Sequence, residues 1–405
     1  MAVSVEEALR LIYENVKQKT TKILPIESAL NHVIAYDIIA THNLPEFDNS
    51  AMDGYAVKCD ATGKTIEVLH TILAGDKEEL LLNDGAAYKI MTGAKVPAGS
   101  EAIVPIEDVQ VDGANVTFTK EIKHGAHIRI AGEDIEIGDT IIDKDTYLCA
   151  HHITLLASQG ISHVCVYNKP RIALFASGSE LKMHYEQLDA HQLYNTNTPT
   201  FAARAKELGC DVEFIGTAKD SLDEIQTMIT KALDYDLIIT SGGVSVGDAD
   251  FTKEAFAAFN FQPIFEKVEI KPGKPTTFGK INGSYVLNLP GNPLAATLNF
   301  ELFAKAAILA MSGNEAKYIN FIETKIKNDL RLRPGKRTLI PGYFDGSSFT
   351  PNEKFAPGMV SPMAHANGFI MIDESVSELS AGASVKFIST RFDFTCKEQK
   401  DLVTR

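Results

Sequence analysis

Apolar and polar positions follow two different patterns along the chain, and these patterns predict regions of different structure. Between about residues 171 and 311, continuous apolar runs such as Arg171–Ala176 and Asp236–Thr240 alternate with amphipathic stretches. Continuous apolar runs are typical of strands buried on both faces of a parallel sheet, and the stretches between them have a helical period. This alternation predicts a doubly wound α/β sheet with helices on both faces.

Start and stop signals place the helices of this α/β region. Thr198 stands before Pro199, which predicts a helix with Thr198 as its N-cap, and Gly209 ends it. Ser221 and Glu224 have the spacing of a capping box for the next helix. Further strands are expected at residues 210–216, 265–270 and 284–289, and a last helix is expected after Pro293.

Short strand-like runs separated by turn residues flank the α/β region on both sides. One set extends from about Phe47 to Ile142 and the other begins at about Ile319. The N-terminal residues predict an amphipathic helix, with Ser4 and Glu7 as a capping box. The chain is therefore expected to be multidomain, with an α/β domain flanked by a β-rich N-terminal insertion and a C-terminal β-barrel.

Composition and charge restrict the class of protein. The 405 residues carry a formal net charge of -14, which argues against a nucleic-acid or membrane-surface binder. The five cysteines are scattered without a CxxC pair, so no structural zinc site is expected. No signal peptide is evident, and no apolar run is expected to approach membrane-spanning length. A cytoplasmic protein is expected.

A glycine-rich segment, Ser241–Asp250, follows a predicted buried strand and opens a helix. Glycines allow backbone amides to approach a phosphate, and a helix N-terminus favours an anion. Gly242 and Gly247 have Walker A spacing, but Asp248-Ala249 replaces the Lys-Ser/Thr pair, which excludes a P-loop NTPase. Two aspartates beside a phosphate require Mg²⁺ between them. A tight turn with Asp250 as an N-cap is the alternative.

A local group of cations follows in the stretch Lys267–Pro275. The strand period places Lys267, Glu269 and Lys271 on one face, and prolines stiffen the turn that carries Lys274. Such a group can bind an anion on an acidic protein, although protective lysines on a solvated edge strand give the same pattern. The next strand ends in the rigid turn Leu289–Pro293.

Polar residues also stand at the ends of other predicted strands. Ser177–Glu180 follows the first strand, Asn195–Asn197 precedes a helix, and Asp220 lies at a strand-to-helix turn. Ligands of open α/β sheets bind outside the carboxyl ends of the strands, so these segments should converge there. Glu180 is a candidate Mg²⁺ ligand; the alternative is a surface carboxylate.

Three turns of the β-rich region carry polar groups beside a glycine: Phe47–Val57, Met91–Ala94 and Arg129–Asp134. Each alone is an ordinary turn. Together they suggest a second half-site that faces the α/β domain.

Six strings in this chain resemble, in order and spacing, the molybdopterin molybdenumtransferase family, called MoeA in bacteria and the gephyrin E-domain in animals. They are FDNSAMDGYAV, IMTGAKVPAG, AGEDI, SGGVSVGDADF, KPGKPTTFG and LPGNPLAA. The resemblance implies a homodimer of four-domain subunits, in which domain III of one subunit faces domain II of the other. Its implied domains are a helical linker domain I at 1–46 and 138–168, a β-rich domain II at 47–137, a molybdopterin-binding α/β domain III at 169–313, and a β-barrel domain IV at 318–405.

The resemblance also implies a reaction, in which adenylylated molybdopterin and molybdate give molybdenum cofactor and AMP with the aid of Mg²⁺. Other enzymes of this pathway are expected partners. Molybdate and tungstate are tetrahedral oxyanions of nearly equal size, so a pocket of Lys and Arg cannot easily separate them and the sequence does not distinguish the two. The implied catalytic positions are Asp53, Thr92, Asp134, Glu180, Asp220 and Asp250, with Glu180 and Asp250 as metal ligands. The implied substrate-binding positions are Arg129, Gly242, Gly243, Ser245, Gly247, Lys267, Lys271, Lys274, Pro290, Asn292 and Pro293.

One position departs from the family pattern. Many members have Ser/Thr-Gly-Asp-Glu-Leu where this chain has Ser179 in place of the Asp, so one carboxylate beside Glu180 is lost. Two other functions are compatible with parts of the sequence. A molybdopterin adenylyltransferase shares the α/β domain but lacks the FDNSAMDGYAV region, and a pterin-binding scaffold would release no AMP.

Overall fold

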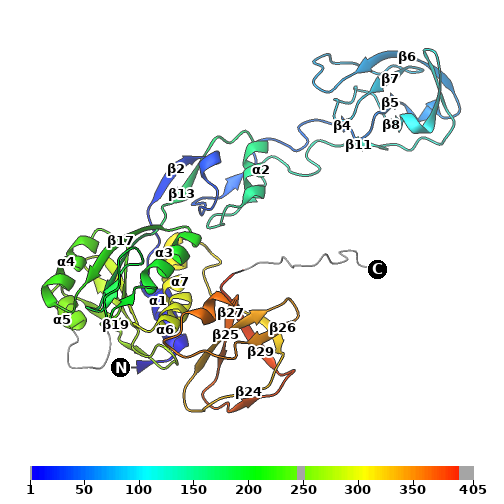
Figure 1. Ribbon diagram of the computed structural model, residues 1–405. Helices are drawn as coiled ribbons and strands as arrows, with labels where there is room; N and C mark the ends of the chain where they lie inside the picture. The colour runs from blue at the N-terminus through cyan, green and yellow to red at the C-terminus, as the bar shows by residue number, and fades with distance from the viewer. Residues whose placement is uncertain (1, 244–250, 392–405) are drawn as a thin grey trace.

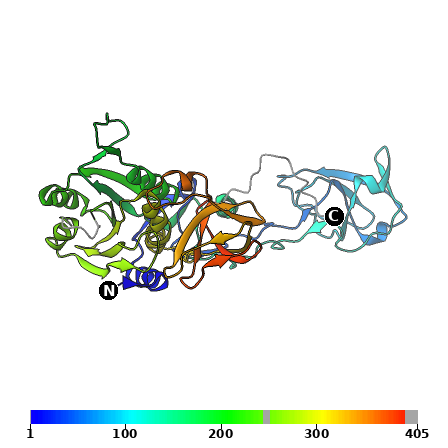
Figure 2. The same ribbon diagram turned by 60° about the horizontal axis from the view of Figure 1, so that its bottom comes forward.

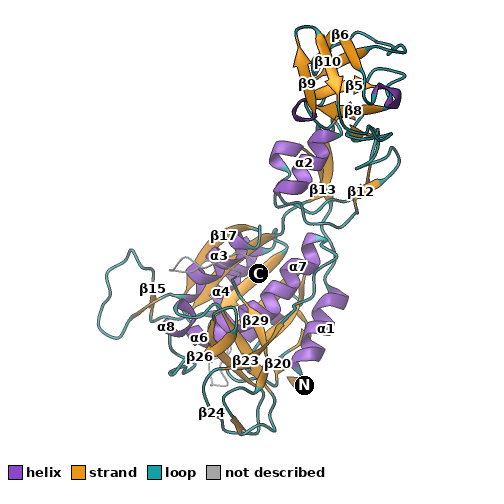
Figure 3. Cartoon of the chain, turned by 90° about the vertical axis from the view of Figure 1, so that its right-hand side faces the viewer, coloured by secondary structure: helices purple, strands orange, loops and turns teal. Residues whose placement is uncertain are grey.

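The computed structural model describes residues 2–243 and 251–391 and shows an elongated molecule (Figure 1). An α/β body and a barrel lie side by side at one end, and a β-rich sheet lies at the other. A two-stranded ribbon, β2 (Thr21–Pro25) paired antiparallel with β13 (His163–Tyr167), leaves the body toward the sheet. Helix α2 (Ala150–Ser158) lies beside this ribbon (Figure 3).

The body contains a six-stranded sheet in the order β17-β14-β18-β22-β21-β19. The first four strands are parallel, whereas β21 runs antiparallel to β22 and β19 antiparallel to β21. The sheet is therefore mixed at one edge. Its strands are β14 (Arg171–Ser177), β17 (Asp211–Ala218), β18 (Leu237–Ser241), β19 (Gln262–Phe265), β21 (Thr277–Ile281) and β22 (Ser284–Leu289).

Helices cover both faces of this sheet, as the alternating pattern predicts. Ile225 and Ile229 of α4 and Phe256 of α5 pack with Phe175 of β14 on one face. The continuous helical stretch of α6, η4 and α7 packs on the other face together with α1 and α3. The bounds of these helices are α1 (Val5–Asn15), α3 (Asn197–Glu207), α4 (Leu222–Ala232), α5 (Phe251–Ala257), α6 (Pro293–Asn299), the π-helical turn η4 (Phe300–Ala304) and α7 (Lys305–Ser312).

Helix α3 begins earlier than expected. It starts at Asn197 rather than after an N-cap at Thr198, so Pro199 is its third residue. The reason is that Thr198 is already engaged by Asn195, whose side chain accepts from the Thr198 backbone N–H at 3.2 Å and donates to its hydroxyl at 2.7 Å. The N-cap assignment of Thr198 is therefore wrong, although the helix is confirmed.

The two predicted capping boxes form only in part. Ser4 accepts a hydrogen bond from the Glu7 backbone at 3.1 Å, and Ser221 accepts one from Glu224 at 3.3 Å. The return bonds are replaced, because the Glu7 carboxylate pairs with Arg10 and the Glu224 carboxylate accepts from the Lys219 backbone. Both helices still begin where the serines predict.

The helical stretch Pro293–Ser312 is long and apolar enough to cross a membrane by length and composition, and it is the one candidate in the described part of the chain. The expectation that no run approaches this length is therefore wrong. Burial explains the composition, since 83% of its most apolar window lies inside the fold. It is the central helix of the body.

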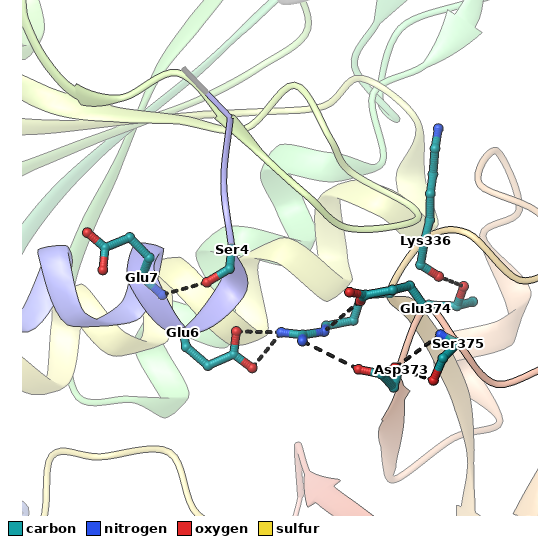
Figure 4. A network of polar contacts seen from close by, with 9 residues as sticks. Ser4, Glu6, Glu7, Lys336, Asp373, Glu374 and Ser375 are labelled. Carbon is teal, nitrogen blue, oxygen red and sulfur yellow. Dashed lines mark hydrogen bonds and ion pairs between the residues drawn. The ribbon is translucent and has the colours of Figure 1, made fainter.

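Helix α1 joins the body and the barrel. Val5, Ala8 and Ile12 are buried in the body's core, which also includes Leu339 and Phe369 of the barrel. Strand β1 (Ala2–Val3) pairs with β20 (Lys267–Val268). Figure 4 shows the polar side of this junction, where the Arg337 guanidinium pairs with Glu6 and lies 3.7 Å from the carboxylates of Asp373 and Glu374.

The barrel is closed by β23-β26-β25-β27-β29, which confirms the predicted C-terminal barrel. Its strands are β23 (Ile322–Ile326), β25 (Thr338–Phe344), β26 (Ser348–Pro351), β27 (Gly368–Ile372) and β29 (Ser384–Ser389), with the short helix α8 (Ser361–Ala364) and the pair β24 (Leu330–Arg331) and β28 (Glu378–Leu379) outside it.

The β-rich sheet at the far end has the order β8-β5-β7-β6-β10-β9. Its strands are β5 (Gly54–Val57), β6 (Thr65–Ile72), β7 (Ala87–Ile90), β8 (Ala102–Pro105), β9 (Val109–Asp112) and β10 (Asn115–Phe118). The short pair β4 (Asn49–Ser50) and β11 (Ile128–Arg129) lies at the end of this sheet that faces the body. Between this pair and the β2–β13 ribbon lies a second short pair, β3 (Ile38–Ile39) and β12 (Thr140–Ile142).

Candidate active site

The carboxyl ends of the four parallel strands meet at one edge of the body's sheet. In the register, Ser177 lies opposite Ala218, and Ser241 lies opposite both Ala176 and Leu289. The loops that follow these strands therefore leave the sheet together. The predicted convergence of the segments containing Glu180, Asp220, Gly242 and Pro290 is confirmed.

Asn197 connects two of these loops. Its side-chain amide donates to the Ser241 hydroxyl at 2.7 Å and to the Gly291 carbonyl at 2.8 Å, and the residue is buried. The end of β18 and the turn before α6 are thus held together by one side chain. The sequence indicates Asn195–Asn197 as a ligand loop, but this structural role of Asn197 depends on partners 44 and 94 residues away.

The glycine-rich segment begins in a close approach of two backbones. Gly242 has a φ of +95°, and a Cβ there would lie 2.3 Å from the Ser177 carbonyl oxygen. Only glycine fits, which agrees with a segment that brings backbone amides to a ligand. Gly243 follows it and is half-buried. Ser245, Gly247 and Asp250 of the predicted site lie outside the described residues.

Glu180 and Asp220 lie on neighbouring loops of this edge, and both are exposed. Ser179 links the loops: its backbone N–H donates to the Asp220 carboxylate at 3.1 Å, and its hydroxyl accepts from the Asp220 N–H at 3.1 Å. Ser179 thus orients Asp220. Within the described residues, no group of three or more His, Cys, Asp or Glu side chains could hold a metal ion.

The lysines lie on a turn between the body and the barrel. Lys267, Lys271 and Lys274 are exposed, and the residues between the first two alternate between buried and exposed as predicted. The expected continuous strand at 265–270 is wrong, because the Ile270 N–H donates to the Val268 carbonyl and turns the chain after β20. Lys271 instead exchanges backbone hydrogen bonds with the barrel, donating to Arg337 and accepting from Leu339.

The turn between β22 and α6 contains the other three predicted substrate-binding positions. Pro290 is buried, Asn292 is exposed, and Pro293 begins α6. The turn therefore presents Asn292 at the carboxyl edge and starts the central helix there.

A second polar cluster lies at the base of the β-rich sheet. The backbone N–H and the hydroxyl of Thr92 both donate to Asp53 Oδ1 at 2.7 Å. These bonds hold the pKa of the Asp53 carboxyl below its usual value. Asp53 is therefore a carboxylate at neutral pH, and it is exposed to solvent.

Arg129 and Asp134 lie near this cluster through the β4–β11 pair. Arg129 stands opposite Asn49 in the ladder, and its Nε donates to Glu133 at 2.6 Å. The Asp134 backbone donates to the Leu44 carbonyl, and its carboxylate is exposed. Glu133 was present in the predicted segment, but its pairing with Arg129 was missed; the four-residue spacing of opposite charges was the available signal.

The two clusters lie at opposite ends of one chain (Figures 1 and 2). Asp53, Thr92, Arg129 and Asp134 belong to the distal sheet and its base, whereas Glu180, Asp220 and the lysines belong to the body. A single subunit does not bring the predicted site together. Each cluster is exposed, so each is available to another molecule.

Residues 173–310, which form the α/β body with this carboxyl edge, match the family model described as a probable molybdopterin binding domain. The models of the MoeA N-terminal region (domain I and II) and the MoeA C-terminal region (domain IV) match residues 3–160 and 323–390.

Known proteins match along almost the whole chain. A molybdopterin molybdenumtransferase of Staphylococcus epidermidis is 34% identical over 404 residues, with 96% of both chains covered. One of Staphylococcus aureus is 32% identical over 406 residues with the same coverage. The crystal structure of a molybdopterin biosynthesis MoeA protein from Pyrococcus horikoshii has a TM-score of 0.84 and 28% identity, and it covers 97% of this chain and 100% of that one. The chain belongs to the molybdopterin molybdenumtransferase family, enzymes of molybdenum cofactor biosynthesis.

Proposed function

We propose that this enzyme inserts molybdenum into molybdopterin: adenylylated molybdopterin and molybdate give molybdenum cofactor and AMP, with Mg²⁺ as the cofactor. The observation that carries the proposal is the carboxyl edge of the body, where Gly242 and Gly243, exposed lysines and two carboxylates gather on an acidic protein. The match of relatives over 96% of the chain supports it. It also favours this function over that of an adenylyltransferase, which lacks the β-rich region.

The lysines offset the repulsion between the two anionic substrates of this reaction. A pyrophosphate diester and a molybdate ion repel each other, so cations must offset the repulsion when both occupy one pocket. Lys267, Lys271 and Lys274 are exposed beside the edge and supply three positive charges. The backbone amides of the segment that begins at Gly242 would hold phosphate oxygens without adding charge. Attack by an oxygen of water or molybdate would cleave the phosphoanhydride bond and release AMP. The pterin dithiolate would then bind molybdenum in place of two molybdate oxygens, which leave as water.

The residues at the edge fit Mg²⁺, which prefers carboxylate and hydroxyl oxygens. Glu180 and Asp220 are exposed carboxylates on adjacent loops, and Ser179 joins the loops. We propose Glu180 and Asp250 as ligands, with Asp220 close by. The bound ion would polarise phosphate oxygens and stabilise charge on the leaving group.

A homodimer would complete the site. The two polar clusters lie at opposite ends of the molecule. In the proposed homodimer, a two-fold axis would bring the distal sheet of one subunit against the body of the other. Asp53, Thr92, Arg129 and Asp134 would then face the lysines of the partner. A cytoplasmic enzyme that exchanges substrate with other molybdenum cofactor enzymes fits this assignment, with no nucleic acid or membrane involved.

AMP release tests the proposal directly. Purified enzyme is given adenylylated molybdopterin in four reactions, with or without molybdate and with Mg²⁺ or EDTA. We expect AMP only when molybdate and Mg²⁺ are both present, and tungstate should replace molybdate. Equal release in EDTA without oxyanion would refute the proposed reaction.

A further inference from the structure

The central helix is interrupted at the point where it passes the lysine turn. Helix α6 ends at Asn299, the π-helical turn η4 follows, and α7 continues to Ser312. Asn299 is fully buried at 0% exposure. Asparagine is a poor helix former, and a buried amide is costly unless its hydrogen bonds are made, so this residue calls for an explanation beyond packing.

The Asn299 side chain joins its own helix to the lysine turn. Its Nδ2 donates to the Ala295 carbonyl at 2.7 Å and to the Pro272 carbonyl at 3.1 Å. Its Oδ1 accepts from the Thr276 hydroxyl at 3.0 Å, and that hydroxyl also lies 2.8 Å from the Gly273 carbonyl. One N–H of the amide therefore bonds within its own helix. The other N–H and the oxygen both bond to residues 272–276.

Steric contact reinforces these hydrogen bonds. Gly273 has a φ of +110°, and a Cβ on it would lie 1.8 Å from Asn299 Nδ2. The backbone of the turn at Gly273 therefore packs directly against the Asn299 side-chain amide. Lys271 and Lys274 stand on either side of this contact, one residue away from Pro272 or Gly273.

We infer that Asn299 is a positioning residue for the anion site, which fixes Lys271 and Lys274 relative to the Pro290–Pro293 turn. The argument rests on the proposed function of these lysines. Asn299 lies six residues after Pro293 on one helix, about 9 Å along its axis at 1.5 Å per residue. The helix thus fixes the distance between the carboxyl edge and Asn299, and the Asn299 amide fixes the lysine turn relative to the helix.

Position matters because an anion site works through preorganised charge. Ammonium groups that must be brought into place lose binding energy for the oxyanion, and a displacement of about 1 Å can cost up to a hundredfold. The lysine ammonium groups keep their charge when Asn299 is changed, so only their placement is affected. The effect is therefore expected on molybdate affinity.

The test uses the full-length enzyme and the AMP-release reaction. Asn299→Leu keeps the size and removes the amide, while Thr276→Val removes the same connection from the side of the turn. We expect each to raise the KM for molybdate about tenfold, with kcat within about twofold of wild type. The double variant should be little worse than either single one, because both belong to one network.

Ser312→Ala is the matched control, because it also removes a side-chain hydrogen bond from this helix, to Leu309 at 2.8 Å, away from the turn. Its KM should equal that of wild type. An unchanged molybdate KM in both test variants, or a loss confined to kcat, would overturn the positioning role. If Asn299→Leu fails to fold, Thr276→Val decides alone. A wild-type enzyme that releases no AMP refutes the proposed reaction instead, so the two failures are distinct.

Discussion

Thr92 donates two hydrogen bonds to one oxygen of Asp53, from its backbone N–H and from its hydroxyl, and both are 2.7 Å long. The sheet causes this contact, because Asp53 precedes β5, Thr92 follows β7, and these strands are antiparallel neighbours with Gly54 opposite Ile90. The two bonds fix the direction of an exposed carboxylate and lower its pKa. Asp53 is thus charged and oriented before any ligand or partner arrives.

Thr92→Val should weaken this arrangement, since the backbone bond stays and the hydroxyl bond is lost. The pKa of Asp53 should rise toward its ordinary value, so the acid limb of the pH profile of AMP release should move to higher pH. At neutral pH we expect kcat/KM to fall about tenfold. Thr71→Val, an exposed threonine of the same sheet, is the control. An acid limb that stays in place would mean that the hydroxyl does not control Asp53.

The ion pair between Arg204 and Glu301 should matter for stability. Glu301 is 2% exposed and accepts from Arg204 Nε at 2.6 Å and from Nη2 at 3.1 Å, and Arg204 also donates to the Thr390 carbonyl at 2.8 Å. Glu301→Gln removes the buried counter-charge of a largely buried guanidinium and leaves only the exposed Glu207. We expect a loss of about 3 kcal/mol in the free energy of unfolding, measured by urea denaturation at pH 7.

Glu207 provides the matched control for this pair. It also binds Arg204, but its side chain is 61% exposed. Glu207→Gln should cost under about 1 kcal/mol, because solvent screens an exposed pair. Equal losses in the two variants would show that burial does not set the strength of the Glu301 contact.

Asp345 should make the barrel sensitive to strong acid. Hydrogen bonds from the Ser347 hydroxyl and from the backbone of Ser348 and Ser347 lower the pKa of its carboxyl from 3.8 to about 2. A lowered folded-state pKa gives stability that is present above pH 3.8 and is lost as the pH falls toward 2. Asp345→Asn should lower the Tm by a few degrees at pH 7, and the difference should shrink as the pH falls through about 2. A difference independent of pH would exclude this ionisation as its cause.

Much of the body could be predicted from the sequence because its parallel strands are buried on both faces. The apolar runs that became β14, β18 and β22 are the direct result of that burial. Strand β21 was missed, because Thr277–Ile281 contains a glycine and a lysine and lacks an apolar run. Pairing with β22 on one side and β19 on the other makes it a strand.

The site could be predicted as a set of loops but not as a set of contacts. Strand ends and glycines indicated where ligands bind, and the edge formed as expected. The amides that hold the loops, Asn197 and Asn299, act on residues up to 94 positions away, and no local pattern contains such a partner. The lysine turn likewise pairs with the barrel, at Lys271 and Thr338, rather than continuing a strand.

The packing of α1 limits what an isolated α/β domain can do. Val5, Ala8 and Ile12 are buried in the body, and each fully buried aliphatic side chain larger than alanine contributes about 1.5–3 kcal/mol. A fragment of residues 169–313 should therefore melt well below the full chain, and a peptide of residues 2–16 should raise its Tm. Once folded it should bind the pterin without turnover, because Asp53, Thr92 and Arg129 are absent. Normal AMP release by the fragment would contradict the two-cluster site.

Mixed dimers should reveal whether the two clusters meet across subunits. One subunit carries Asp53→Ala and the other Lys271→Ala; both residues are exposed, so both variants should keep a Tm near that of wild type. If each active site joins the distal sheet of one chain to the body of the other, one site of the mixed dimer receives both defects and the other receives neither. Each homodimer should lose about tenfold or more in AMP release, since a placed charge contributes a few kcal/mol to the transition state. Purified heterodimers should regain about half of the wild-type rate, because one of their two sites is intact. Heterodimers no more active than the homodimers would refute an active site shared between the two subunits.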